Sequence, residues 1–155
     1  MKPITFSCGA TLDFSPGDIS QQILDVAKWS DFRGFAIIPG IKEAAFEVKT
    51  PQIIGSRIRV TNTDGSSHVE EIVEWQPGSR VTLHLKEFSA PLARLATAFE
   101  ETWMFQMMGS STQVVRSFRL HAKSPLTRPV LWLISFFLRK AINWHLLQMR
   151  DMASP

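Results

Sequence analysis

The chain has one cysteine, Cys8, and no tyrosine among its 155 residues. A single cysteine excludes an internal disulfide, which fits a reducing compartment. No spacing of cysteine and histidine matches a metal-ligand pattern, and glycine-rich phosphate loops, dinucleotide fingerprints and Ser-His-Asp patterns are missing too. We therefore expect no metal, no cofactor, and no ATP, NAD or serine-hydrolase chemistry.

Long hydrophobic runs and blocks of one charge are also missing. The longest apolar run, Pro129 to Leu138 (PVLWLISFFL), ends at Arg139-Lys140 and is too short to span a bilayer. The segment up to Phe14 alternates and includes Asp13, unlike the core of a signal peptide. The 17 Lys and Arg and the 14 Asp and Glu are scattered, for a formal net charge of +3, which argues against a nucleic-acid partner. We expect a cytoplasmic protein.

The chain does have the length of one domain, 1–155, which can bury about two-thirds of its extended surface. Eleven Phe and five Trp supply large rings for a core or a cavity. Alternation predicts a first strand over 4–14, and helical spacing from Ile19 predicts a short helix that ends near Trp29. The segment 30–39 is a second short helix or turn, and strands follow from Ile41 onward. A helix over 126–152 ends the chain.

Turn residues predict how the central strands pair. A two-residue turn at Asp64-Gly65 places Ile58 opposite Glu71, and the turn at Pro77-Gly78 places Trp75 opposite Val81 and Glu71 by Leu85. The two registers agree with each other. The predicted inner face holds Ile58, Val60, Val69, Val73, Trp75, Val81, Leu83 and Leu85, and the outer face holds Arg57, Arg59, His68, Glu70, Glu74, Thr82, His84 and Lys86.

The last hairpin is predicted in the same way. A turn at Gly109-Ser110 sets Met108 opposite Ser111 and Trp103 opposite Arg116. Its apolar face contains Phe99, Trp103, Phe105, Val114, Phe118 and Leu120, with Glu101 and Arg116 embedded in it. The loop before this hairpin carries Leu92 and Leu95, which we expect to cover a pocket mouth.

The C-terminal helix has two distinct faces. Its predicted core stripe is Val130, Ile134, Phe137, Leu138, Ala141, His145, Gln148 and Met152. Trp132, Phe136 and Leu147 lie on the opposite side, beside Arg139, Asn143 and Arg150. This second face suits a homodimer interface or weak contact with a membrane surface, and the alternative is a cover formed by the loops around Phe35 and Leu92.

The segment DVAKWSDFRGFAIIPGIKEA, the strand phrase VEEIVEWQPGSRVTLHL and the closing helix resemble the START and pollen-allergen-like superfamily, in its polyketide cyclase/dehydrase and lipid transport branch. The resemblance covers essentially the whole chain. It implies an α+β helix-grip fold, in which a seven-stranded curved antiparallel sheet wraps a long C-terminal helix, with two short helices after the first strand. Members of the family bind sterols, lipids, polyketides, plant hormones or quinones, and some are cyclases or dehydratases.

Two functions follow as hypotheses. The first is binding or transport of a small hydrophobic ligand in a cavity between sheet and helix, lined by Ile58, Val73, Trp75, Leu83, Phe99, Trp103, Phe105, Phe118, Phe137, Ala141 and Gln148. The second is a cyclase or dehydratase that uses Glu71, Glu101, Arg116 and His145 on the inner face, with His145 or a carboxylate as general base. The structural alternative is that Glu101 and Arg116 form an ion pair, Glu71 is hydrated at the mouth, and His145 is satisfied in the core.

Overall fold

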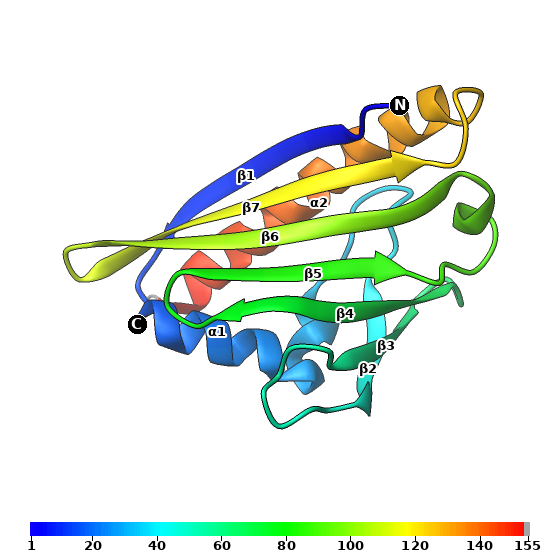
Figure 1. The fold of residues 1–155 in the computed structure, drawn as a ribbon. Helices are drawn as coiled ribbons and strands as arrows, with labels where there is room; N and C mark the ends of the chain where they lie inside the picture. Colours follow the sequence, from blue (N-terminus) through cyan, green and yellow to red (C-terminus); the bar gives the residue numbers. More distant parts are fainter. Residues whose placement is uncertain (154–155) are drawn as a thin grey trace.

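The computed structural model describes residues 1–153. A seven-stranded antiparallel sheet, in the order β1-β7-β6-β5-β4-β3-β2, is crossed on one side by the C-terminal helix α2 (Figure 1). The elements in chain order are β1 (Ile4–Leu12), α1 (Pro16–Leu24), η1 (Val26–Asp31), β2 (Ile41–Val48), β3 (Arg57–Asn62), β4 (Ser67–Gln76), β5 (Arg80–Lys86), η2 (Leu92–Arg94), β6 (Ala96–Met108), β7 (Ser111–Ala122) and α2 (Arg128–Ala153). The expected helix-grip α+β fold is confirmed, and α1 and η1 are its two short helices.

Helix α1 begins where the sequence signals a helix start. The Ser15 Oγ accepts a hydrogen bond of 3.1 Å from the backbone N–H of Asp18, and Pro16 occupies the first turn, where its missing N–H costs nothing. Ile19 and Ile23 lie one turn apart and are both buried. Helix α1 therefore lies across one end of the sheet (Figure 1) and closes that end of the core.

The β6–β7 hairpin has the predicted register. Met108 lies opposite Ser111, and Trp103 lies opposite Arg116. Strand β1 then pairs with the other edge of β7, with Cys8 opposite Arg116. These three strands form the side of the sheet on which α2 packs, as the 3.5 Å contact from the Cys8 thiol to the Arg139 carbonyl oxygen shows.

The predicted register of β3, β4 and β5 is wrong by one residue. The β3–β4 loop has three residues, because the Asn62 N–H donates to the Ser66 carbonyl and Gly65 takes φ of +87°. As a result, Ile58 faces Glu70 and not Glu71. In β4–β5, Trp75 does face Val81, but a bulge between Ile72 and Glu74 then shifts the pairing by one residue.

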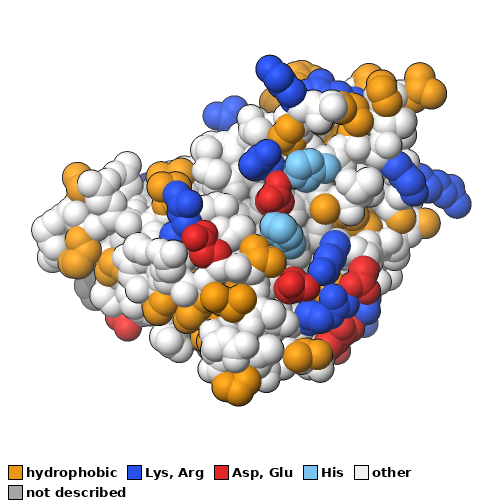
Figure 2. Space-filling model, in the orientation of Figure 1, with side chains coloured by type: hydrophobic (Ala, Val, Ile, Leu, Met, Phe, Trp, Pro, Cys, Tyr) orange, Lys and Arg blue, Asp and Glu red, His pale blue; other side chains and the backbone are white. Residues whose placement is uncertain are grey.

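The three-residue loop and the bulge both exchange the inner and outer faces of β4 between Ser67 and Ile72. Glu70 and His68 turn to the inner face, and Val69 and Glu71 turn to the outer one. Glu71 lies 2.7 Å from the Lys86 amine and 3.7 Å from the Arg57 guanidinium. Figure 2 shows basic and acidic side chains gathered at this end of the sheet's outer face. Glu70 would pair with Arg59 and Lys86 in the predicted register, but Lys86 pairs with Glu71, and Arg59 pairs with Glu47 at 2.7 Å.

Helix α2 is rotated about its axis relative to the predicted stripe. Leu131, Ile142 and Leu146 are buried, whereas Val130 and Met152 from the predicted stripe are 48% and 62% exposed. The physical reason is that α2 packs on β1 and β7, so its buried face turns toward that edge of the sheet. By length and composition alone, Arg128–Met152 is apolar enough to cross a membrane, but these buried residues tie it to the protein core.

Candidate functional site

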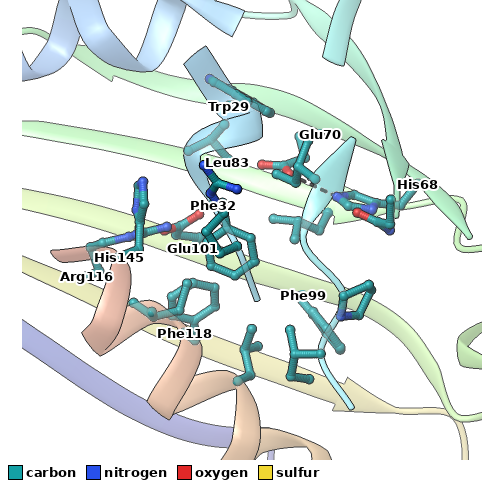
Figure 3. Close-up of a pocket in the computed structure, with 18 of the residues that line it drawn as sticks. Trp29, Phe32, His68, Glu70, Leu83, Phe99, Glu101, Arg116, Phe118 and His145 are labelled. Carbon is teal, nitrogen blue, oxygen red and sulfur yellow. Dashed lines mark hydrogen bonds and ion pairs between the residues drawn. The ribbon is translucent and has the colours of Figure 1, made fainter. Parts of the chain in front are cut away.

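A cavity of about 1080 Å³ lies between the inner face of the sheet, the segment that follows α1, and α2. Most of its wall is aromatic or aliphatic, and two polar clusters interrupt it (Figure 3). Its aromatic side chains are Phe14, Trp29, Phe32, Phe88, Phe99, Trp103 and Phe118. Cavities of this size and character hold small organic molecules in other proteins.

Eight of the site residues predicted from the sequence line this cavity. They are Leu83, Phe99, Trp103, Phe118, Gln148, Glu101, Arg116 and His145, and the mouth residues Leu92 and Leu95 also line it. The β6–β7 register accounts for most of them, because alternation places Phe99, Glu101 and Trp103 on one face.

The remaining predicted site residues lie outside the cavity lining. Ile58 and Ala141 are buried in the packed core, at 0% and 1% exposure, and Val73 lies at the β4 bulge. Trp75 and Phe105 also lie away from the cavity; Phe105 is joined to the β4–β5 turn through Ser79. Phe137 is half-buried and packs against Phe35, with ring centroids 6.4 Å apart. Glu71 is on the outer face, so its predicted inward orientation is wrong.

The first polar cluster is centred on Arg116. Its Nε donates to Glu101 Oε2 at 2.6 Å, and its Nη2 lies 2.5 Å from the same oxygen. Its Nη1 donates to Nδ1 of His145 at 3.0 Å, and its guanidinium lies 4.1 Å from the centroid of the Trp103 ring. The Arg116 and Glu101 side chains are only 7% and 6% exposed, so this is a buried ion pair. The diagonal contact predicted across the hairpin is confirmed.

His145 is held in a neutral form by this cluster. Burial, together with the positive charge of Arg116, lowers the pKa of His145 from 6.5 to about 3. Because Nδ1 accepts the hydrogen bond from Arg116, the ring proton sits on Nε2 and His145 is a hydrogen-bond donor there. So weak a base is poorly matched to proton abstraction near neutral pH.

The surroundings of Glu101 disfavour its ionised form. Burial raises the pKa of Glu101, Arg116 offsets part of this shift, and the charge of Glu70 adds to it. The last contribution is the repulsion between two carboxylates of the cavity lining, one on β4 and the other on β6.

The second polar cluster, His68 with Glu70, was not predicted. The Nε2 of His68 lies 2.9 Å from Glu70 Oε2, and the Phe88 ring packs between His68 and Phe99. The adjacent apolar residues Ile72 and Val73 were the available signal, since strict alternation cannot bury both and a bulge at Val73 moves Glu70 inward.

The segment after α1 contributes two cavity residues, Trp29 and Phe32, that were not predicted. The indole N–H of Trp29 donates to the Ile23 carbonyl at 3.0 Å, which holds the Trp29 ring at the cavity (Figure 3). Phe32 follows and lies edge-on to His145, with ring centroids 5.7 Å apart. Gly34 then makes a tight turn, with φ of +75° and the Ile38 carbonyl oxygen 2.2 Å from where a Cβ would lie. This turn brings Ile37 and Ile38 to the cavity rim.

Comparison of the chain with protein-family models and with curated proteins gives no match. Solved structures do match over nearly their whole length. A START superfamily protein from Mycobacterium smegmatis has a TM-score of 0.67 at 14% identity, covering 94% of this chain and 98% of that one. The chain therefore shares the helix-grip fold with this START superfamily protein.

Two further helix-grip structures show how wide that fold is. Ara h 8.0201 matches with a TM-score of 0.64 at 16% identity, over 94% of this chain and 98% of its own. The Zhui aromatase/cyclase from Streptomyces sp. R1128 matches with 0.72 at 11% identity, over 96% and 93%. The helix-grip fold is thus shared by proteins described in different functional terms, and the choice among functions depends on the cavity of this chain.

Proposed function

We propose that this protein binds a small hydrophobic ligand in the cavity between the sheet and α2 and acts as its carrier. The observation that carries the proposal is the cavity itself, whose volume of about 1080 Å³ is framed by seven aromatic side chains. A void of this size costs stability when it is empty, because its walls lose the contacts that close packing supplies. An apolar occupant restores those contacts.

The polar groups in the cavity favour a carrier over an enzyme. Arg116 is already bonded to Glu101 and His145, and Glu71 lies outside. His145, with a pKa of about 3, is too weakly basic for the general-base role that a cyclase or dehydratase would give it. Burial raises the pKa of Glu101, but this carboxylate is bonded to Arg116, so the arrangement favours orienting a ligand by hydrogen bonds.

Dye uptake tests the carrier proposal directly. The purified protein is titrated with Nile red, a neutral hydrophobic dye whose emission rises in an apolar site. Leu138→Trp places a large ring in the cavity, whereas Leu133→Trp adds the same ring on the exposed side of α2, where Leu133 is 49% exposed. We expect micromolar binding that Leu138→Trp weakens about tenfold or more and that Leu133→Trp leaves unchanged. Absence of dye binding to the unmodified protein, or equal effects of the two variants, contradicts the proposal.

We further propose that the exposed face of α2 contacts an anionic lipid surface. Trp132, Phe136 and Trp144 are 59%, 48% and 52% exposed, and the loop around Phe35 covers none of these three completely. Four basic residues and one acidic residue lie on α2, so two copies packed face to face would bring like charges together. Anionic headgroups complement this charge, at about 1 kcal/mol for each basic residue near the surface.

The same face adjoins the cavity rim. The Phe35 ring contacts both Phe137 and Trp144 on α2, and Ile37, two residues further on, lines the cavity and is 59% exposed. Sedimentation with vesicles checks the proposal: binding is expected with anionic phosphatidylglycerol, weaker binding with phosphatidylcholine alone, and loss in Trp132→Ser/Phe136→Ser. A stable dimer by light scattering, with no vesicle binding, would support the homodimer instead. The cytoplasmic location expected from the sequence stays a prediction.

A further inference from the structure

Arg116 is the only deeply buried cation on the cavity wall of the described chain, and its guanidinium is already bonded to other side chains. Arg116 gives Nε and Nη2 to Glu101 and Nη1 to His145, and its flat face lies on the Trp103 ring. His145 is neutral and offers only a donor N–H. A ligand that ends in a carboxylate therefore finds no unpaired buried cation to replace its lost hydration, and only the His145 N–H as a donor in this cluster.

Negative charge, in contrast, is available to a ligand. Glu70 and Glu101 are 7% and 5% exposed, and both belong to the cavity lining. Glu70 contacts His68 through Oε2, and Glu101 accepts from Arg116 through Oε2. Within residues 1–153, neither Oε1 has a hydrogen-bond or ion-pair partner. Since no fully enclosed side-chain oxygen in that part of the chain lacks a partner, these two oxygens border the open cavity.

The two carboxylates also repel each other, which is one cause of the raised pKa of Glu101. Figure 3 shows both side chains directed into the cavity, Glu70 beside His68 and Glu101 beside Arg116. A positive group bound near both would relieve that repulsion and receive charge-assisted hydrogen bonds from their free oxygens. The cavity rim also has more acidic than basic residues, with Asp31, Asp64 and Asp151 against Lys28 and Arg33.

We propose that the cavity selects amphiphiles whose polar end is a protonated amine, bound at Glu70 and Glu101, over amphiphiles of equal length that end in a carboxylate. This inference rests on the proposed function, because it names the class of ligand for the same cavity. The apolar part of such a ligand packs on Phe32, which lies between the two polar clusters, and on Phe99 and Phe118 below it in Figure 3. The formal net charge of the whole chain is +3, so nonspecific attraction would favour the acid and cannot produce this preference.

The test is a displacement assay with three matched chains. Dodecylamine, dodecanol and dodecanoate compete with Nile red at about pH 7.5 and at concentrations below micelle formation. We expect the amine to bind most tightly and the acid most weakly, with an amine-to-acid ratio of about tenfold or more. In Glu70→Gln the amine-to-acid ratio should fall several-fold.

The neighbouring residue supplies the matched control. Glu71→Gln removes a carboxylate from the same strand but from the outer face, and should leave the ratio unchanged. Equal affinity for amine and acid in the unmodified protein, or an equal effect of the two variants, overturns the inference. If dodecanol binds without an amine preference, only this inference fails, whereas if the dye and all three chains fail to bind, the carrier function fails with it. Circular dichroism confirms that each variant is folded.

Discussion

Replacing Arg116 with methionine is the most direct perturbation of the buried polar cluster. Methionine keeps a long unbranched side chain over Trp103 but removes the guanidinium that bonds Glu101 and His145. Glu101, whose side chain is 6% exposed, then keeps its charge in an apolar setting without a partner. The expected effect is a loss of folding stability that depends on whether Glu101 is ionised.

The magnitude follows from burial. Removing one partner of a buried ion pair costs about 3–5 kcal/mol, a large part of the roughly 5–15 kcal/mol that holds a typical domain folded. For a urea dependence of about 2 kcal/mol per molar, the midpoint should fall by roughly 2 M.

The loss should also depend on pH with a defined sign. Burial already raises the pKa of Glu101, and Arg116 opposes that shift, so its removal raises this pKa further. A carboxyl group whose folded pKa lies above its unfolded value contributes stability that is present at low pH and lost as pH rises. The deficit of Arg116→Met should therefore shrink between about pH 7.5 and pH 5.

The assay is urea unfolding followed by circular dichroism at both pH values, for Arg116→Met and for the double variant Arg116→Met/Glu101→Leu. The double variant removes both charges and should recover most of the lost stability, because an apolar pair can replace a buried ion pair at little cost. A single-variant loss below about 1 kcal/mol, or a double variant as unstable as the single one, would refute the reasoning.

Two further predictions concern His145 and the buried face of α2. His145 has a folded pKa of about 3 against 6.5 when exposed, so the unfolded chain binds the extra proton and stability falls as pH drops through that window. This contributes a loss of about 2 kcal/mol between about pH 7 and pH 5, which His145→Asn should remove in pH-dependent unfolding. Leu131→Ala, at a side chain that is 0% exposed, should cost about 2–5 kcal/mol in urea unfolding, while Leu133→Ala on the exposed side should cost under about 1 kcal/mol; equal losses would contradict the observed rotation of α2.

The β6–β7 hairpin shows how far the sequence alone can specify a site. A two-residue turn and unbroken alternation on both strands leave one register, and that register places Glu101 diagonally from Arg116. The contact, and the position of both residues on the inner face, were predictable because every step was local along the chain.

The β3–β5 region shows the opposite. Asp64-Gly65 is compatible with a two-residue and a three-residue loop. The bulge at Val73 inserts one unpaired residue into β4, which shifts the register again. The two errors were equal in size, so the two wrong registers agreed with each other and assigned Glu71 in place of Glu70. Agreement between neighbouring hairpins therefore does not detect a bulge on the strand that they share.

The sequence by itself determined the order of the elements and the apolar character of the inner face, since these follow from alternation, helical period and turn residues. The helix-grip fold was implied by the resemblance to the START and pollen-allergen-like superfamily. Only the tertiary structure decided which face of α2 is buried and which carboxylate of β4 enters the cavity. It also decided that Trp29 and Phe32 complete the wall. The physical reason is that rotation of a helix about its axis and the parity of a bulged strand depend on packing between distant segments, which no local pattern encodes.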